Sequence, residues 1–117
     1  MIALICGGRH YTGVKQIYTW MNAFHTLHKL QLVVTGGATG ADTIAAEWAL
    51  AHHVNLTTMN AKWDLQGVRA GYLRNEEMLR FVMKFADPVL IAFPGGVGTE
   101  NMTDLATGTL EIFRPYA

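Results

Sequence analysis

Serine is absent from this chain of 117 residues, and cysteine occurs only once, as Cys6. The absence of serine excludes every mechanism that depends on a serine nucleophile. A single cysteine cannot form an internal disulfide or a thiolate metal cluster. Because no charged-then-apolar leader opens the chain either, we expect a cytoplasmic protein.

Charged residues are scarce as well, at 15%, and nine Lys and Arg balance nine Asp and Glu. Since no run of like charge occurs, the chain lacks the electrostatic pattern of a nucleic-acid binder, and we expect no nucleic-acid partner. The apolar runs are far shorter than the roughly 18 residues that a bilayer crossing needs, so we expect no membrane partner. Half of the residues are apolar, which excludes a disordered chain and predicts one domain over residues 1–117.

Short apolar runs alternate with longer segments of helical period, a pattern typical of an α/β protein with a parallel sheet. We predict a single Rossmann-like domain, with a five-stranded open parallel sheet and helices on both faces. The expected strands are 2–6, 31–35, 55–59, 88–93 and 109–113, and the expected helices are 14–27, 41–53, 67–85 and 99–106. In the commonest order of such a sheet the first and fourth strands are neighbours, and ligands bind beyond the carboxyl ends of the strands.

Eight of the twelve glycines lie in three turns that directly follow predicted strands. Glycine permits positive φ and close approach of a ligand to the backbone, and the N–H groups of a following helix can hold an anion. Three such turns on one sheet edge predict a cradle for a phosphate and a ribose, although each turn alone is equally well explained as a strand terminator. None is a Walker loop or a GxGxxG turn, so ATP hydrolysis and ordinary NAD chemistry are weakly supported. The predicted ligand-binding residues are Gly7, Gly8, Arg9, Gly36, Gly37, Ala38, Gly40, Ala41, Asp42, Arg74, Asn75, Pro94, Gly95, Gly96, Gly98 and Thr99.

Three charged side chains in or near these turns have two interpretations each. Asp42 can cap amide donors or accept a ribose hydroxyl, and capping is the favoured role. Arg9 offers a positive charge to a phosphate, or is a solvated loop arginine. Arg74 and Asn75 lie on the inward face of the third helix, where a guanidinium can reach a phosphate; the alternative for Arg74 is an ion pair with Glu77 or another acid.

Two tryptophans are candidates for the site and for a subunit contact, and two histidines are candidates for a metal site. Trp63 either lines the site or belongs to the core. Trp20 lies off the main apolar stripe of its helix and suggests a subunit contact, so we expect a homodimer or a higher homo-oligomer. His25 and His28 lie one turn apart without a carboxylate or cysteine beside them, and we predict no metal and no cofactor.

Four segments occur in a characteristic order along nearly the whole chain: GGR at 7–9, GGATGAD at 36–42, RNEEM at 74–78 and PGGVGT at 94–99. In this order they resemble the SLOG superfamily, which includes the LOG (Lonely Guy) proteins and DprA-like domains, and above all its short YspA-like branch. The resemblance implies a Rossmann-like sheet that binds nucleotides or nucleotide derivatives, including ADP-ribose-type signals, at its glycine-rich edge. It also implies a bacterial or phage protein.

LOG enzymes cleave the N-glycosidic bond of nucleoside 5′-monophosphates and carry the motifs R-K-x-x-M and P-G-G-x-G-T-x-x-E. In this chain Asn75 replaces the lysine, and Met102 takes the place of the final glutamate. The cleavage passes through an oxocarbenium-like state that a carboxylate stabilises and a thioether does not. We therefore expect binding of a small-molecule nucleotide derivative, for sensing or sequestering a signal. The alternatives are a phosphoribohydrolase with Arg74 and Glu100 (or Asp104) as catalytic residues, and an assembly protein whose glycine turns are purely structural.

Overall fold

The computed structural model describes all residues 1–117, and its centre is one five-stranded parallel sheet of order β3-β2-β1-β4-β5. All five expected strands are present, with slightly shorter ends, and β1 pairs with β4 as expected. The predicted fold class, an α/β Rossmann-like sheet, is thus confirmed. The strands are β1 (Ile2–Cys6), β2 (Leu32–Thr35), β3 (Asn55–Thr58), β4 (Pro88–Ala92) and β5 (Glu111–Phe113).

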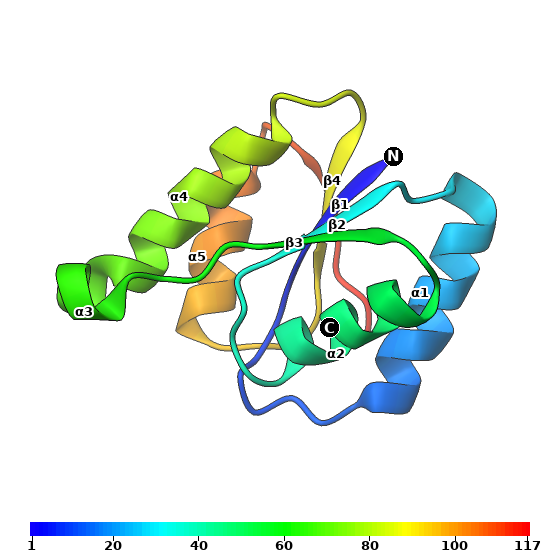
Figure 1. The fold of residues 1–117 in the computed structure, drawn as a ribbon, viewed down its shortest axis with the longest axis horizontal. Coiled ribbons are helices and arrows are strands. Elements are labelled where there is room, and N and C mark those ends of the chain that lie inside the picture. The colour runs from blue at the N-terminus through cyan, green and yellow to red at the C-terminus, as the bar shows by residue number, and fades with distance from the viewer.

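Helices cover both faces of the sheet (Figure 1). Helices α1 (Val14–His28) and α2 (Ala41–Ala51) pack on one face, and α4 (Ala70–Val82) and α5 (Val97–Ala106) pack on the other. The central strand β1 is buried along its whole length. Because side chains alternate along a strand, Ala3 and Ile5 join the core of the first pair of helices, whereas Ile2 and Leu4 join the core of the second.

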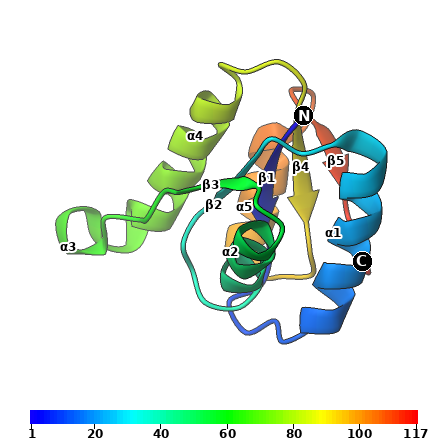
Figure 2. The same cartoon turned by 45° about the vertical axis from the view of Figure 1, so that its right-hand side comes forward.

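The third predicted helix, 67–85, is wrong in its boundaries. The chain instead forms α3 (Trp63–Gln66), a short 3-10 turn η1 (Gly67–Arg69) and then α4. Gly67 has a φ of +60°, a left-handed conformation that interrupts an α-helix and that glycine adopts without a steric penalty. As a result, α3 extends away from the sheet as a separate arm (Figure 2). Phe85, the last residue of the predicted helix, lies beyond the end of α4 and is 40% exposed.

The first helix matches its predicted position, and the stripe that it buries is narrow. Val14 and Leu27 are exposed at its two ends, and the helix buries Ile17, Met21 and Phe24. Trp20, expected at a subunit contact, stacks on Phe24 with 5.0 Å between ring centroids and also packs against the aromatic rings of the core. Packing within the chain therefore accounts for Trp20 without a second subunit. No helix has both the length and the apolar character needed to cross a membrane.

Candidate functional site

The three glycine-rich turns meet at the carboxyl ends of β1, β2 and β4, where they border one another. The turns that follow β1 and β4 form most of the wall of a cavity of about 580 Å³, to which the turn after β2 and helix α4 add further side chains. Strand order reverses here. Strands β2 and β3 lie on one side of β1, and strands β4 and β5 lie on its other side. This is the position at which open parallel sheets bind ligands. Of the predicted ligand-binding residues, the cavity is lined by Gly7, Gly8, Arg9, Ala38, Asp42, Arg74, Asn75, Pro94, Gly95, Gly96, Gly98 and Thr99.

Four of the predicted residues lie outside this cavity. Gly36 and Gly37 line a neighbouring hollow, and Gly40 and Ala41 join the first two turns to each other. The Ala41 N–H donates to the carbonyl oxygen of Gly8 over 3.0 Å. Gly40 has a φ of +77°, and a Cβ at this position would collide with the Gly8 carbonyl. A Cβ on Gly7 would come within 2.5 Å of the Ala41 Cβ. The close packing of the two turns is thus sufficient to explain the glycines at 7 and 40.

The carboxylate of Asp42 occupies the amides of the second turn. Its Oδ2 accepts hydrogen bonds from the N–H groups of Gly36 and Ala38, each over 3.2 Å. Asp42 therefore does cap amide donors, but they belong to the turn before α2 rather than to the first turn of the helix. Burial raises the pKa of Asp42 to about 6, although its two backbone hydrogen bonds and the nearby Arg74 favour the charged form. These two amides are consequently not free to hold an external anion.

The third turn, at the start of α5, differs because its amides have no partner in the protein. The Gly8 N–H donates to the Pro94 carbonyl over 2.9 Å, which fixes the start of the turn, but the N–H groups of residues 95–99 have no acceptor. A Cβ on Gly96 or Gly98 would meet no atom within 4 Å, and neither glycine has a positive φ. Neither packing nor backbone conformation therefore requires glycine at these two positions, and their amides border open space.

Arg74 extends from α4 to the second turn. Its Nη1 donates to the carbonyl oxygen of Gly36, and its Nε donates to Oδ1 of Asn75 over 3.0 Å. Arg74 thus bonds to Gly36 and Asn75, and the alternative ion pair with Glu77 does not form. A guanidinium has five N–H donors, so three remain free beside the cavity. A Cβ on Gly36 would clash with the guanidinium, which explains the glycine at that position.

Asn75 connects α4 to α5. It is 4% exposed, and its Nδ2 donates to the Gly98 carbonyl over 3.2 Å and to Oδ1 of Asn101 over 2.9 Å. The sequence-based interpretation missed Asn101, although its position three residues after Gly98 places it on the same side of α5. This pair of bonds holds the first turn of α5 against α4.

The two expected catalytic residues line different hollows. Glu100 is exposed and borders a hollow of about 540 Å³ on the other side of the third turn, together with Arg114, whereas Arg74 borders the first cavity. Met102 is fully buried in the core, and Asp104 is exposed and lines neither hollow. The structure therefore does not bring Arg74 and a carboxylate of α5 together.

Several other residues line the first cavity without having been predicted as site residues: Cys6, His10, Tyr11, Met78 and Val97. Burial, reinforced by the nearby Asp42, raises the pKa of the Cys6 thiol far above its ordinary value. The thiol is therefore protonated at neutral pH and is a poor nucleophile. No group of three His, Cys, Asp or Glu side chains is close enough to hold a metal ion.

An open parallel sheet with a glycine-rich cavity at the reversal of strand order is the architecture of a Rossmann-like protein. Within that class, the chain belongs to the YspA, cpYpsA-related SLOG family, whose family model matches residues 1–65. Membership in this family indicates a nucleotide-related function. The match contains the first two turns and Asp42, whereas Arg74, Asn75 and the third turn lie beyond it.

The chain is also similar to the Gene 61 protein of Mycobacterium phage D29. The two are 44% identical over 77 residues, which cover 60% of this chain and 58% of the phage protein. The similarity thus extends over little more than half of that relative, and its name does not describe an activity.

Proposed function

We propose that the first cavity binds a nucleotide or nucleotide derivative, with a phosphate at the start of α5. The observation that carries this proposal is that the N–H groups of residues 95–99 have no hydrogen-bond partner in the protein. Within this segment, a side chain at Gly96 or Gly98 would project into open space. A phosphate oxygen is a strong acceptor for such amides, and the positive end of the helix dipole adds to the attraction.

The charges around the cavity favour the third turn over the second for the phosphate. The Asp42 carboxylate already holds the amides of Gly36 and Ala38, and a second anion beside it would be repelled. A ribose hydroxyl, in contrast, can donate a hydrogen bond to a carboxylate oxygen. We therefore assign the sugar to the side of the cavity that Asp42 lines, and Arg74 to the phosphate or the group that follows it.

Binding is better supported than cleavage of an N-glycosidic bond. Asp42 is the one carboxylate that lines the first cavity, and two backbone amides occupy it. Glu100 borders a different hollow, and the Cys6 thiol is protonated. The cavity thus offers binding groups but no unoccupied carboxylate to stabilise an oxocarbenium-like state.

The test compares ribose 5-phosphate, AMP, ADP-ribose and adenosine as ligands of the purified protein. A phosphate-bearing ligand at one hundred times its Kd should stabilise the fold by about 2.7 kcal/mol, which thermal unfolding detects readily. Chromatography of the same mixtures reports free adenine. Stabilisation without base release supports a binder, release of adenine with turnover supports the phosphoribohydrolase, and no response to any phosphate-bearing ligand refutes the proposal.

A further inference from the structure

A second hollow, of about 380 Å³, borders the first cavity and shares Arg9, Ala38 and Arg74 with it. Its remaining wall comes from the second glycine turn and from the segment after β3, which contributes Asn60 and Trp63. The site described above does not use that segment. A ligand that fills the first cavity can therefore continue past Arg9 and Arg74 into this second space.

Trp63, the first residue of α3, is half exposed but held in place. Its indole lies over Gly71 of α4, where a Cβ would come within 3.2 Å of the ring carbon Cη2. The glycine thus lets the indole rest against the helix, while half of the side chain remains open. An aromatic ring supported in this way at the wall of a hollow is a surface on which a planar base can stack.

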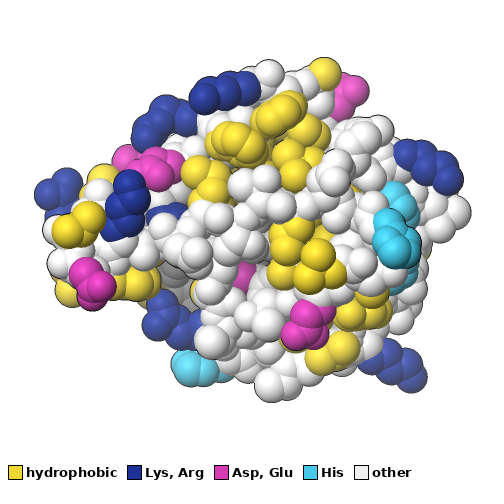
Figure 3. Space-filling view, viewed as in Figure 1, with side chains coloured by type: hydrophobic (Ala, Val, Ile, Leu, Met, Phe, Trp, Pro, Cys, Tyr) yellow, Lys and Arg dark blue, Asp and Glu magenta, His cyan; other side chains and the backbone are white.

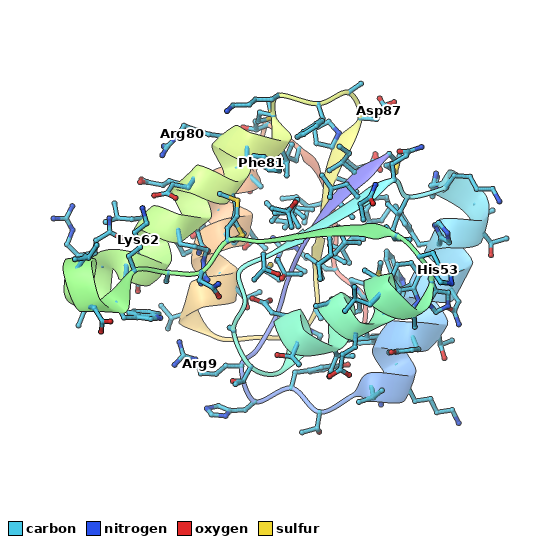
Figure 4. The ribbon with its side chains drawn as sticks, viewed as in Figure 1. Arg9, His53, Lys62, Arg80, Phe81 and Asp87 are labelled. Carbon is cyan, nitrogen blue, oxygen red and sulfur yellow. The ribbon has the colours of Figure 1, made fainter.

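Polar groups suited to a base and a phosphate lie beside the indole. Asn60 is exposed, and its side-chain amide has no hydrogen-bond partner in the protein. An amide of this kind both donates and accepts, as the hydrogen-bonding edge of a base requires. In Figure 4 the Arg9 side chain projects from the loop after β1 toward the side of the molecule on which α3 lies.

Basic side chains are frequent in the segment that forms α3 and α4. Residues 62–84 contain five of the nine Lys and Arg of the chain and three Asp and Glu. The space-filling view shows them gathered over α3 and α4 (Figure 3). Arg80 and Lys84 lie at the far end of α4, whereas Lys62 and Arg69 precede Arg74 at the end that borders the hollows. The positive charge of these three residues attracts a phosphate-bearing ligand.

We propose that the second hollow is the base subsite of the ligand, with Trp63 as the stacking surface and Asn60 as the group that contacts the edge of the base. This inference rests on the proposed function, since it places the base of the same ligand whose phosphate lies at the start of α5. Arg9 and Arg74 then lie along the part of the ligand that joins the two hollows. The ligand class is accordingly a nucleotide with an intact base rather than a phosphosugar alone.

The experiment compares AMP with ribose 5-phosphate, which has the same phosphate and sugar but no base. Calorimetry should give AMP the lower Kd in the wild-type protein. The Trp63→Ala variant should raise the Kd of AMP about tenfold or more and leave that of ribose 5-phosphate unchanged. Trp63→Phe should retain most of the affinity for AMP, because a phenyl ring still stacks. Tyr72→Ala is the matched control, since Tyr72 is an exposed aromatic residue of α4 that lines neither hollow.

Tryptophan fluorescence gives an independent readout. Trp63 is the most exposed of the three tryptophans, as Trp48 is fully buried and Trp20 packs in the core. AMP should quench the fluorescence of the wild-type protein, and the Trp63→Phe variant should lose this quenching while it still binds AMP. Equal loss of both ligands in Trp63→Ala, or AMP affinity equal to that of ribose 5-phosphate in the wild type, would overturn the base subsite alone. Failure of both ligands to bind the wild type would overturn the proposed function together with it.

Discussion

Replacement of Gly98 by alanine should make the fold more stable and the cavity a poorer phosphate site. Gly98 is the second residue of α5 and lines the first cavity. A Cβ there would meet no atom within 4 Å, and φ is not positive, so alanine fits without strain. Alanine in place of glycine at a compatible helical position stabilises a protein by about 0.4–1 kcal/mol.

This gain is large enough to measure. At about 2.1 cal/mol/K per residue, the unfolding entropy of 117 residues is about 0.25 kcal/mol/K, so the Tm should rise by roughly 2–4 °C. In the proposed complex the same methyl group would lie where a phosphate oxygen approaches the backbone. Because a hydrogen bond to a charged acceptor contributes about 1.5–3 kcal/mol, loss of one such bond should weaken AMP binding tenfold or more.

Thermal unfolding followed by circular dichroism and calorimetric titration with AMP measure the two effects. Gly108→Ala is the matched control, because a Cβ at Gly108 also meets open space but φ is +81°. This control should lose about 1–2 kcal/mol of stability and bind AMP normally. If Gly98→Ala raises the Tm and binds AMP as tightly as the wild type, the phosphate does not contact this turn and the assignment is wrong.

Three further variants test the remaining parts of the site. Because the pKa of Asp42 is raised to about 6 in the folded state, the native protein binds more protons than the unfolded chain between about pH 4 and 6. Its stability should therefore fall by roughly 2–3 kcal/mol as the pH rises through this window, and urea denaturation should show a flatter profile for Asp42→Asn. Arg74→Ala should weaken AMP at least tenfold but adenosine only slightly, by calorimetry, since in the proposed complex its free donors would contact the phosphate. Gly40→Ala should cost more than 1 kcal/mol in urea denaturation, because the new Cβ would collide with the Gly8 carbonyl at positive φ.

Each of these variants has an outcome that contradicts the reasoning. Identical pH profiles for Asp42→Asn and the wild type would show that another group causes the loss of stability. Equal weakening of AMP and adenosine by Arg74→Ala would assign the arginine a structural role through its bond to Gly36. Normal stability of Gly40→Ala would mean that the first two turns separate easily.

The sheet could be predicted from the sequence because its signals are local. Strands β1, β2 and β4 are short, largely apolar runs that end at glycine-rich turns, and a continuously apolar β1 requires cover on both faces. The helical period also predicts the outcome on α5, where Met102 is buried and Glu100 is exposed. Two residues apart on a helix correspond to about 200° of rotation, so the two side chains cannot share one face.

The features that escaped prediction depend on backbone conformation or on distant contacts. The predicted helix begins at Gly67, and only the backbone shows that residues 67–69 form a 3-10 turn that separates α3 from α4. The direction of the Asp42 side chain, back toward the turn before it, depends on how tightly that turn closes. The bond between Asn75 and Asn101 requires two helices to pack at a particular register, which no local pattern encodes.

The carboxylate of Asp42 bears on the entropy change of ligand binding. Since it satisfies the amides of Gly36 and Ala38 within the protein itself, the second turn already has its final shape before any ligand arrives. Ligand binding would then need little ordering of this loop. The binding free energy would therefore not be reduced by the conformational entropy that a mobile loop loses. Free and occupied forms should accordingly superimpose closely along this turn.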